Sequence, residues 1–323
     1  YISNGRHCGL VTHTGGGASF LDDPHRMRLL RYKFHLTPYD RPGRYAYIRD
    51  QQTGHYWSAT WSPVVTTPLV KMKFECRVGM GYNRITTEYN GVRAEMLYFV
   101  PPDDDIEIWR LTLTNISKQP RKLRTFSYAE WAVWGVVRDL HNIDNAATCA
   151  RYAYDDGVFW HTTPNDVGAT IVTATWVHPI GYFTSDAKPV GYDGSRDHFL
   201  GAYRDESRPI VVETGKPTNL CANGLYPLGS LAHDWNLKPG QSKTVAFQLA
   251  AGWKKPPLVR LIARYRVPAN VDKAFAKLAD SWTDRLATLQ ATTPDNKSNT
   301  VVHTWAPSQV CSFASKARAV SPV

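Results

Sequence analysis

One long helical pattern lies late in the chain, at residues 270–290, and no comparable helical pattern precedes it. Within it, apolar side chains recur at steps of three and four, which places them on one stripe of an α-helix: Val271, Ala274, Phe275, Leu278, Trp282, Leu286 and Leu289. Asn270 is suited to cap the first turn, and Thr293-Pro294 marks a stop beyond the last. Because helices and strands do not alternate before residue 270, the sequence disfavours a doubly wound parallel sheet.

The segments before this helix alternate between apolar and polar residues and are separated by glycine, proline and asparagine-glycine turns. Residues 86–100 give the clearest case, because Asn90-Gly91 between two alternating runs is the strongest short-range indication of a β-hairpin. The other expected strands are residues 8–13, 44–49, 57–61, 106–113, 124–134, 159–161, 169–176, 210–213 and 244–250. Many short antiparallel strands predict a mainly β fold with two large packed sheets, ending near residues 253–257 where helical patterning begins.

Composition limits the possible partners. Hydrophobic residues make up 43% of the chain and aromatic residues 12%, which is ample for the core of a soluble globular protein. The net charge of +10 suggests a nucleic-acid or anionic partner. The basic residues are scattered, however, so we expect a solvated basic surface and no nucleic-acid partner. No apolar stretch approaches the roughly 18 residues that span a membrane, so no membrane partner is expected.

The five cysteines give no metal or disulfide pattern. Cys8, Cys76, Cys149, Cys221 and Cys311 are far apart, odd in number and without a CxxC spacing. Neither a disulfide framework nor a zinc site is therefore indicated. Reduced thiols in a cytoplasmic protein are the simplest explanation. We expect a cytoplasmic location and no metal or cofactor.

Two polar segments are candidates for ligand binding. The first carries Arg26, Arg28 and Arg31 near two carboxylates. Guanidinium groups suit phosphate or sugar hydroxyls, but a salt-bridged surface is an equal alternative. The second, residues 139–145, holds two aspartates, a histidine and two asparagines, a set of side chains that commonly bind sugar hydroxyls. Asp139 and Asp144 would also serve as an acid/base pair, although the sequence does not fix their separation.

Three other motifs favour structural interpretations. The glycine run at residues 15–17 lacks the lysine and hydroxyl residue of a phosphate-binding loop, so a turn is favoured. Trp131, next to Glu130, is a potential sugar-stacking residue, but a core position in a sandwich is favoured. The segment around Asp193-Gly194 is expected to be a tight turn, with Arg196 paired between carboxylates.

Several long motifs resemble glycoside hydrolase family 94, and they occur in the family's order along nearly the whole chain. They are TGGGASF (14–20), RMRLLRY (26–32), YDRPGRYAYIRD (39–50), EYNGVRAEMLYFVP (88–101), SYAEW (127–131) and YDGSRDHFLGAYRDESRP (192–209). NVDKAFAKLADSW (270–282) is similar to the family's linker helix, and residues 302–310 are similar to its first barrel residues. The family contains inverting disaccharide phosphorylases, cellobiose and chitobiose phosphorylases among them.

The resemblance implies a galactose-mutarotase-like β supersandwich, a helical linker and an (α/α)6 barrel, usually in a homodimer. It implies reversible phosphorolysis of a β-linked disaccharide to an α-sugar 1-phosphate and a free sugar. One aspartate protonates the glycosidic oxygen while inorganic phosphate, the co-substrate, attacks the anomeric carbon. Because phosphate is already an anionic nucleophile, no second carboxylate is needed to activate water.

For this chain, the resemblance implies a supersandwich at residues 1–254, a linker at 255–295 and the start of a truncated barrel at 296–323. The family's catalytic aspartate and most phosphate ligands belong to the barrel beyond residue 323. We therefore expect an amino-terminal fragment that is inactive alone and has no catalytic residue. By motif position, the substrate-lip residues are Arg26, Arg28, Arg31, Asp139, Asn142 and Asn145.

Two alternatives remain open. One is an independent sugar-binding sandwich. The other is a mutarotase-like enzyme that uses His141 and Glu130. The direction of the apolar stripe on the 270–290 helix distinguishes these two alternatives from the fragment hypothesis. Only a fragment has reason to direct Phe275, Leu278 and Trp282 outward, toward its missing barrel. Such a patch also predicts poor solubility of the isolated segment.

Overall fold

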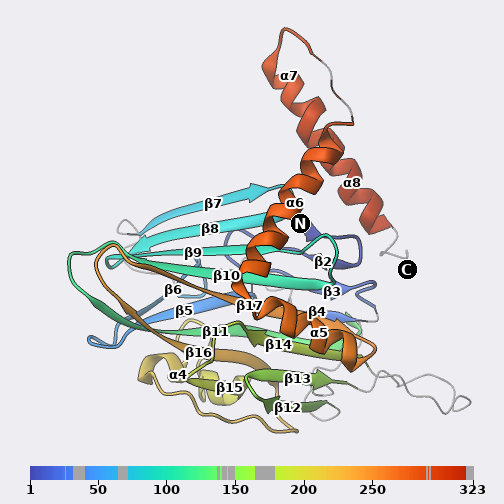
Figure 1. Cartoon of the computed structure of the whole chain (residues 1–323). Coiled ribbons are helices and arrows are strands. Elements are labelled where there is room, and N and C mark those ends of the chain that lie inside the picture. Colours follow the sequence, from blue (N-terminus) through green and yellow to red (C-terminus); the bar gives the residue numbers. More distant parts are fainter. Residues whose placement is uncertain are drawn as a thin grey trace, which may run out of the picture.

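The computed structural model describes residues 1–25, 27–31, 41–64, 72–136, 139, 144, 150–163, 179–288, 290 and 292–317. Two antiparallel sheets dominate these residues, and helices pack on the outer faces of both sheets (Figure 1). The mainly β, two-sheet fold expected from the sequence is confirmed.

The first sheet has nine strands. Its main path runs through β1 (Ile2–Ser3), β2 (His7–Gly9), β3 (Ser19–Leu21), β4 (Arg28–Leu30), β11 (Arg121–Trp134), β16 (Pro227–Leu237) and β15 (Gly191–Ser195). The long strand β11 also pairs with β5 (Arg44–Asp50), which pairs with β6 (Tyr56–Ser58). β11 thus joins the first half of the chain to the second half.

The second sheet has eight strands. In spatial order they are β12 (Arg151–Asp155), β13 (Val158–Thr162), β14 (Ile180–Ser185), β17 (Ser242–Gly252), β10 (Ile106–Asn115), β9 (Val92–Phe99), β8 (Tyr82–Tyr89) and β7 (Lys73–Gly79). The turn between β8 and β9 holds Asn90 and Gly91 at φ of 48° and 73°, as a type I′ hairpin requires. The predicted hairpin is confirmed.

The space between the sheets contains the main apolar core, which includes Trp57, Trp109 and Trp131. Trp131 is fully buried, so the core interpretation of this residue holds and sugar stacking on it is excluded. The glycine run at residues 15–17 forms a turn: a Cβ on Gly17 would lie 1.9 Å from the carbonyl oxygen of Leu10.

Two short segments differ from their expected local structure. Residues 210–213 form part of helix α4 (Ile210–Thr214) rather than a strand, because Pro209 precedes the first turn and Gly215 ends the helix in a left-handed conformation. Asp193-Gly194 lies within strand β15 rather than in a turn. The strand expected at residues 169–176 falls outside the described residues.

Helices follow the last strand. α5 (Lys255–Tyr265) and α6 (Pro268–Leu286) lie across the second sheet, and the chain continues into α7 (Asn296–Thr300), a π-helical turn η2 (Val301–Trp305) and α8 (Ala306–Ala317) (Figure 1). Asn270 does not cap α6, because the helix starts two residues earlier with Pro268 in its first turn and Val267 as N-cap. The Asn270 side chain instead donates to the Arg264 carbonyl at 2.9 Å.

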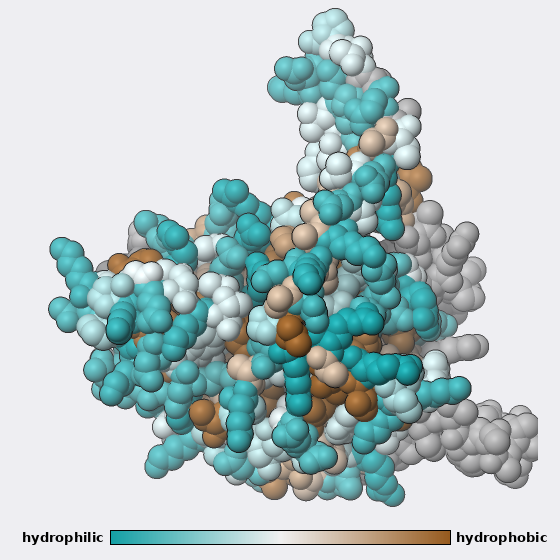
Figure 2. All heavy atoms as spheres, viewed as in Figure 1, coloured by the Kyte–Doolittle hydropathy of each residue, from teal (hydrophilic) through white to brown (hydrophobic). Residues whose placement is uncertain are grey.

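The apolar stripe of α6 does not point outward as expected. Leu278 and Trp282 are buried, and Phe275 packs edge-on against Tyr82 and Phe99, at ring distances of 5.4 and 5.2 Å. The stripe is therefore covered by the outer face of the molecule's own second sheet. In Figure 2, the face that carries α5 and α6 is mostly hydrophilic, with only separate apolar patches. The expectation of poor solubility loses its basis.

Apolar side chains are exposed in the segment after α7, at Val301, Trp305 and Val310.

Among the described residues, no helix combines the length and apolarity needed to cross a membrane.

Candidate functional site

Three of the predicted lip residues come together. Arg28 lies in β4, Arg31 follows that strand, and Asp139 follows β11. Arg31 donates from Nε and Nη2 to both carboxylate oxygens of Asp139, at 3.2 and 2.9 Å, and Arg28 Nη2 donates to Asp139 Oδ2. The exposed fractions of these side chains are only 5% for Arg28, 1% for Arg31 and 2% for Asp139. The cluster is therefore an internal ion-pair cluster and not an open lip.

The cluster carries more donors than acceptors. Arg28 Nε and Nη1 and Arg31 Nη1 are buried and have no acceptor among the described residues. Burial, assisted by the charge of Arg31, lowers the pKa of Arg28 to about 9. Burial also lowers the pKa of Arg31, against the opposing effect of Glu130. Unpaired buried donors of this kind are costly, so this part of the fold is suited to receive further acceptor groups.

A second set of ion pairs lies beside the cluster, and we call it the Glu130 network. Glu130, in β11, is buried and accepts from the Tyr128 hydroxyl and from Arg196 Nε, the latter at 2.8 Å. Arg196 Nη2 lies 3.4 Å from Glu206, which also pairs with Arg41 at 3.2 Å. The expected ion pairing of Arg196 is thus confirmed, but within its own segment only Asp197 contributes, at 3.5 Å, because Asp193 accepts from Thr218 instead.

This geometry bears on the catalytic alternatives. Asp139 already accepts from two guanidinium groups, which leaves it poorly placed to donate a proton as a general acid. Asp144 accepts from the Tyr226 hydroxyl, and Tyr226 is close enough to Arg31 to affect the pKa of that residue. Glu130 is ion-paired and buried. The histidine that would act with it, His141, lies outside the described residues, as do Arg26, Asn142 and Asn145.

Sequence reasoning did not identify Glu206 or Tyr226 as part of this region. Glu206 does lie in the YDGSRDHFLGAYRDESRP motif, but contacts between residues 130, 196 and 206 have no spacing pattern by which they could be recognised. Tyr226 contacts Asp144 across 82 positions of the chain, which is also without local signal.

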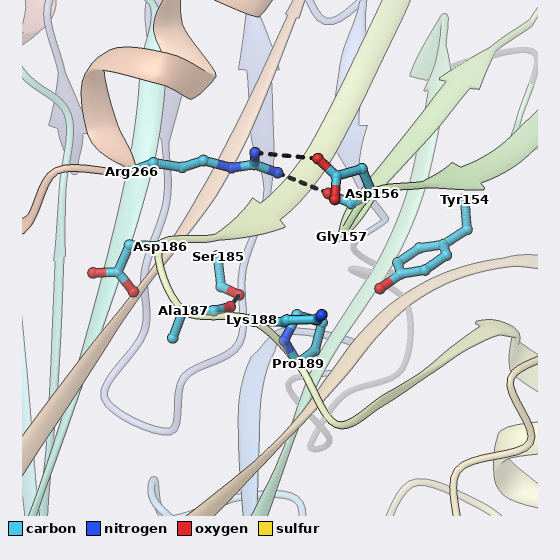
Figure 3. Close-up of a pocket in the computed structure, with 9 residues that line it drawn as sticks. All are labelled: Tyr154, Asp156, Gly157, Ser185, Asp186, Ala187, Lys188, Pro189 and Arg266. Atoms are coloured by element: carbon cyan, nitrogen blue, oxygen red, sulfur yellow. Dashed lines mark hydrogen bonds and ion pairs between the residues drawn. The ribbon is translucent and has the colours of Figure 1, made fainter.

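A pocket of about 440 Å³ lies apart from these residues (Figure 3). It is formed by the β12–β13 turn, the loop between β14 and β15, and Arg266, whose Nη2 donates to the Asp156 carbonyl at 2.8 Å. Burial raises the pKa of Asp186, in its wall, to about 6. The pocket lies beside the start of β15, whereas Arg196 directly follows its end, and neither Arg28, Arg31 nor Asp139 lines it.

No cluster of three or more potential metal ligands is found in the part of the chain that the structure describes. The four described cysteines, Cys8, Cys76, Cys221 and Cys311, form no disulfide bond with one another.

The sequence of this chain is similar to a known protein family and to several characterised proteins. The family model of the glycosyl hydrolase 94 supersandwich domain matches residues 1–268. The N,N'-diacetylchitobiose phosphorylase of Vibrio proteolyticus is 33% identical over 94% of this chain, and the solabiose phosphorylase of Paenibacillus borealis is 29% identical over 99%. The cyclic beta-(1,2)-glucan synthase NdvB of Rhizobium meliloti is 27% identical over 85%.

These matches cover only part of each relative. The chain spans 37% of the length of the Vibrio proteolyticus protein, 40% of the Paenibacillus borealis protein and 10% of the Rhizobium meliloti protein.

Proposed function

Because this chain belongs to glycosyl hydrolase family 94 through its supersandwich domain, we propose that it is the amino-terminal part of an inverting disaccharide phosphorylase. The observation that carries the proposal is the match to disaccharide phosphorylases over 94–99% of this chain and 37–40% of theirs. The whole protein would convert a β-linked disaccharide and inorganic phosphate to an α-sugar 1-phosphate and a free sugar. Phosphate is its co-substrate, and it uses no other cofactor.

In this proposal the catalytic acid lies on an (α/α)6 barrel outside these residues, which the chain contacts as its partner. The strands end at Gly252 and α5 begins at Lys255. This supports a supersandwich domain at residues 1–254 and a helical linker at 255–295, followed by the first barrel residues at 296–323. We also propose a cytoplasmic homodimer.

The chain itself would supply sugar-contacting loops. Arg26, Asn142 and Asn145 are the proposed contact residues. Arg28, Arg31 and Asp139 play a different part, because Asp139 is buried between the two arginines. We assign these three as positioning residues that attach the segment after β11 to strand β4. The donors of Arg28 and Arg31 that have no acceptor among the described residues are then available to acceptor groups of a ligand or of the adjoining loops.

The test is an assay of the protein encoded by the complete reading frame. We expect phosphate consumption with a β-linked disaccharide such as cellobiose or N,N'-diacetylchitobiose, and none with residues 1–323 alone. Phosphate consumption by residues 1–323 alone would contradict the assignment of the catalytic acid to a barrel. A complete protein that consumes no phosphate with any β-linked disaccharide would overturn the proposed activity.

An independent carbohydrate-binding sandwich is the second candidate, and one observation favours it. The stripe of α6 is covered by the chain's own second sheet, so the segment folds without needing a partner at that surface. Sugar binding by the isolated chain, from a reading frame that encodes no barrel, would establish this candidate.

A further inference from the structure

Tyr203 has an unusual position in the loop between α3 (Arg196–Leu200) and α4. Its relative exposure is 108%, and its backbone has a φ of 57°, in the left-handed region that L residues rarely adopt. A large aromatic ring normally stabilises a protein by being buried, and the Tyr203 ring is not buried. Neither burial nor backbone preference explains a tyrosine at this position, so a role outside folding is indicated.

Hydrogen bonds across and after residue 203 hold the loop that carries Tyr203. The backbone N–H of Arg204 donates to the Gly201 carbonyl at 3.3 Å, and that of Arg208 donates to the Asp205 carbonyl at 3.0 Å. Arg204 Nη1 also donates to the Arg208 carbonyl, at 3.3 Å, and to Glu213. The ring is therefore presented from a cross-linked loop, which lowers the entropy lost when a ligand stacks on it.

Tyr203 lines two hollows in the surface. One, of about 600 Å³, is also lined by Arg196, Asp197 and His198. The other, of about 500 Å³, is lined by Arg204, Asp205 and Arg208 among others. The larger hollow adjoins the Glu130 network, because Arg196 lines its wall and donates to Glu130. Tyr203 is thus on the same side of the sandwich as the Glu130 network.

The chemistry of the larger hollow fits a saccharide. A sugar ring has an apolar C–H face, which packs on an aromatic ring, and hydroxyl groups, which both donate and accept. Asp197 offers a carboxylate that is 55% exposed. The two arginines of this hollow are already committed, Arg196 to Glu130 and Glu206, and Arg204 to Glu213. A phosphate group would find no unpaired guanidinium there, whereas a neutral hydroxyl-rich ligand needs none.

We propose that Tyr203 is a sugar-stacking residue, and that a saccharide unit binds in the larger hollow, which Tyr203 and Arg196 both line. The choice of ligand rests on the proposed function. The stacking itself needs no catalytic group, so it is measurable on residues 1–323.

The experiment is a titration of residues 1–323 with cellobiose and with N,N'-diacetylchitobiose, followed by saturation-transfer NMR. We expect binding by the unmodified chain. Tyr203→Ala should weaken it by at least about tenfold, which corresponds to about 1.4 kcal/mol, and Tyr203→Phe should retain it because the ring remains. Trp305→Ala is the matched control, because Trp305 is another exposed aromatic residue, 48% accessible, outside the loop. It should bind like the unmodified chain.

Folding of the variants is checked by circular dichroism. Tyr203→Gly gives a second loss-of-ring variant that relieves the backbone conformation, so weakened binding in it reports the ring and not misfolding. Three results would overturn the proposal: unchanged binding by Tyr203→Ala, no binding of either disaccharide by the unmodified chain, or a Tyr203-dependent dimer with no effect on sugar.

Failure here is distinguishable from failure of the proposed function. Phosphate consumption by the complete protein, together with Tyr203-independent sugar binding, removes the stacking role alone. Tyr203-dependent binding without phosphate consumption removes the phosphorylase assignment alone.

Discussion

Replacing Asp139 with asparagine removes a carboxylate to which both Arg28 and Arg31 donate hydrogen bonds. Arg31 donates hydrogen bonds to both of its oxygens. The exposed fraction of the arginine side chains is 5% for Arg28 and 1% for Arg31, so both are buried. Breaking a buried ion pair by removing one partner costs about 3–5 kcal/mol, because the remaining charge stays buried. Glu130 still attracts Arg31. We therefore expect a loss near the lower end, about 3 kcal/mol of unfolding free energy.

The assay is urea unfolding of residues 1–323 followed by tryptophan fluorescence. With a slope of about 3 kcal/mol per molar urea, the midpoint should fall by about 1 M. Asp272→Asn is the matched control, because Asp272 forms an exposed ion pair with Arg110, at 2.7 Å. It should cost less than about 1 kcal/mol. Equal, small losses in both variants would refute the positioning role of Asp139.

Three further changes test other parts of the structure. Gly81→Ala should destabilise the chain by about 1–3 kcal/mol, because Gly81 has a φ of 74° and its new Cβ would lie 2.6 Å from Trp282 Nε1. Helix α6 should then become accessible to protease, and an unchanged digestion pattern would contradict this. Burial raises the pKa of the Asp193 carboxyl from 3.8 to about 7, so the folded state binds this proton more tightly than the unfolded state. The stabilisation by this proton is complete below about pH 4 and is lost as the pH rises through 7. Relative to wild type, Asp193→Asn should therefore gain up to about 4 kcal/mol between pH 4 and pH 7 in unfolding titrations, and a difference independent of pH would refute the assignment. Tyr203→Gly should raise the unfolding free energy by about 1 kcal/mol, and a lower thermal midpoint would show that the ring supports the fold.

The parts of the fold that sequence predicted are those set by local chemistry. Asn90-Gly91 adopts positive φ at both positions almost regardless of context, so its hairpin was recognisable. The Ile210-Val211-Val212 run was misread because β-branched residues favour strands, whereas the flanking Pro209 and Gly215 decide for a helix. For α6, periodicity identified which side chains share a face but not what covers that face.

The site was less accessible to sequence reasoning. Arg31 and Asp139 are separated by 108 positions, and their contact depends on the pairing of β4 with β11. Motif resemblance brought these residues to attention, but it gave no indication that they would be buried and paired with each other. Tyr203 was within a recognised motif, yet its exposure and its left-handed backbone are properties of the folded loop.

The most direct test of the proposed phosphorolysis is the configuration of any sugar phosphate that the complete protein forms. A β-linked disaccharide and inorganic phosphate are incubated with that protein, and the anomeric proton of the product is observed by NMR at the earliest times. Inversion by direct attack of phosphate should give the α-sugar 1-phosphate and one equivalent of free sugar. Release of two free sugars without phosphate uptake, or formation of a β-sugar 1-phosphate, would contradict the proposed inverting phosphorylase.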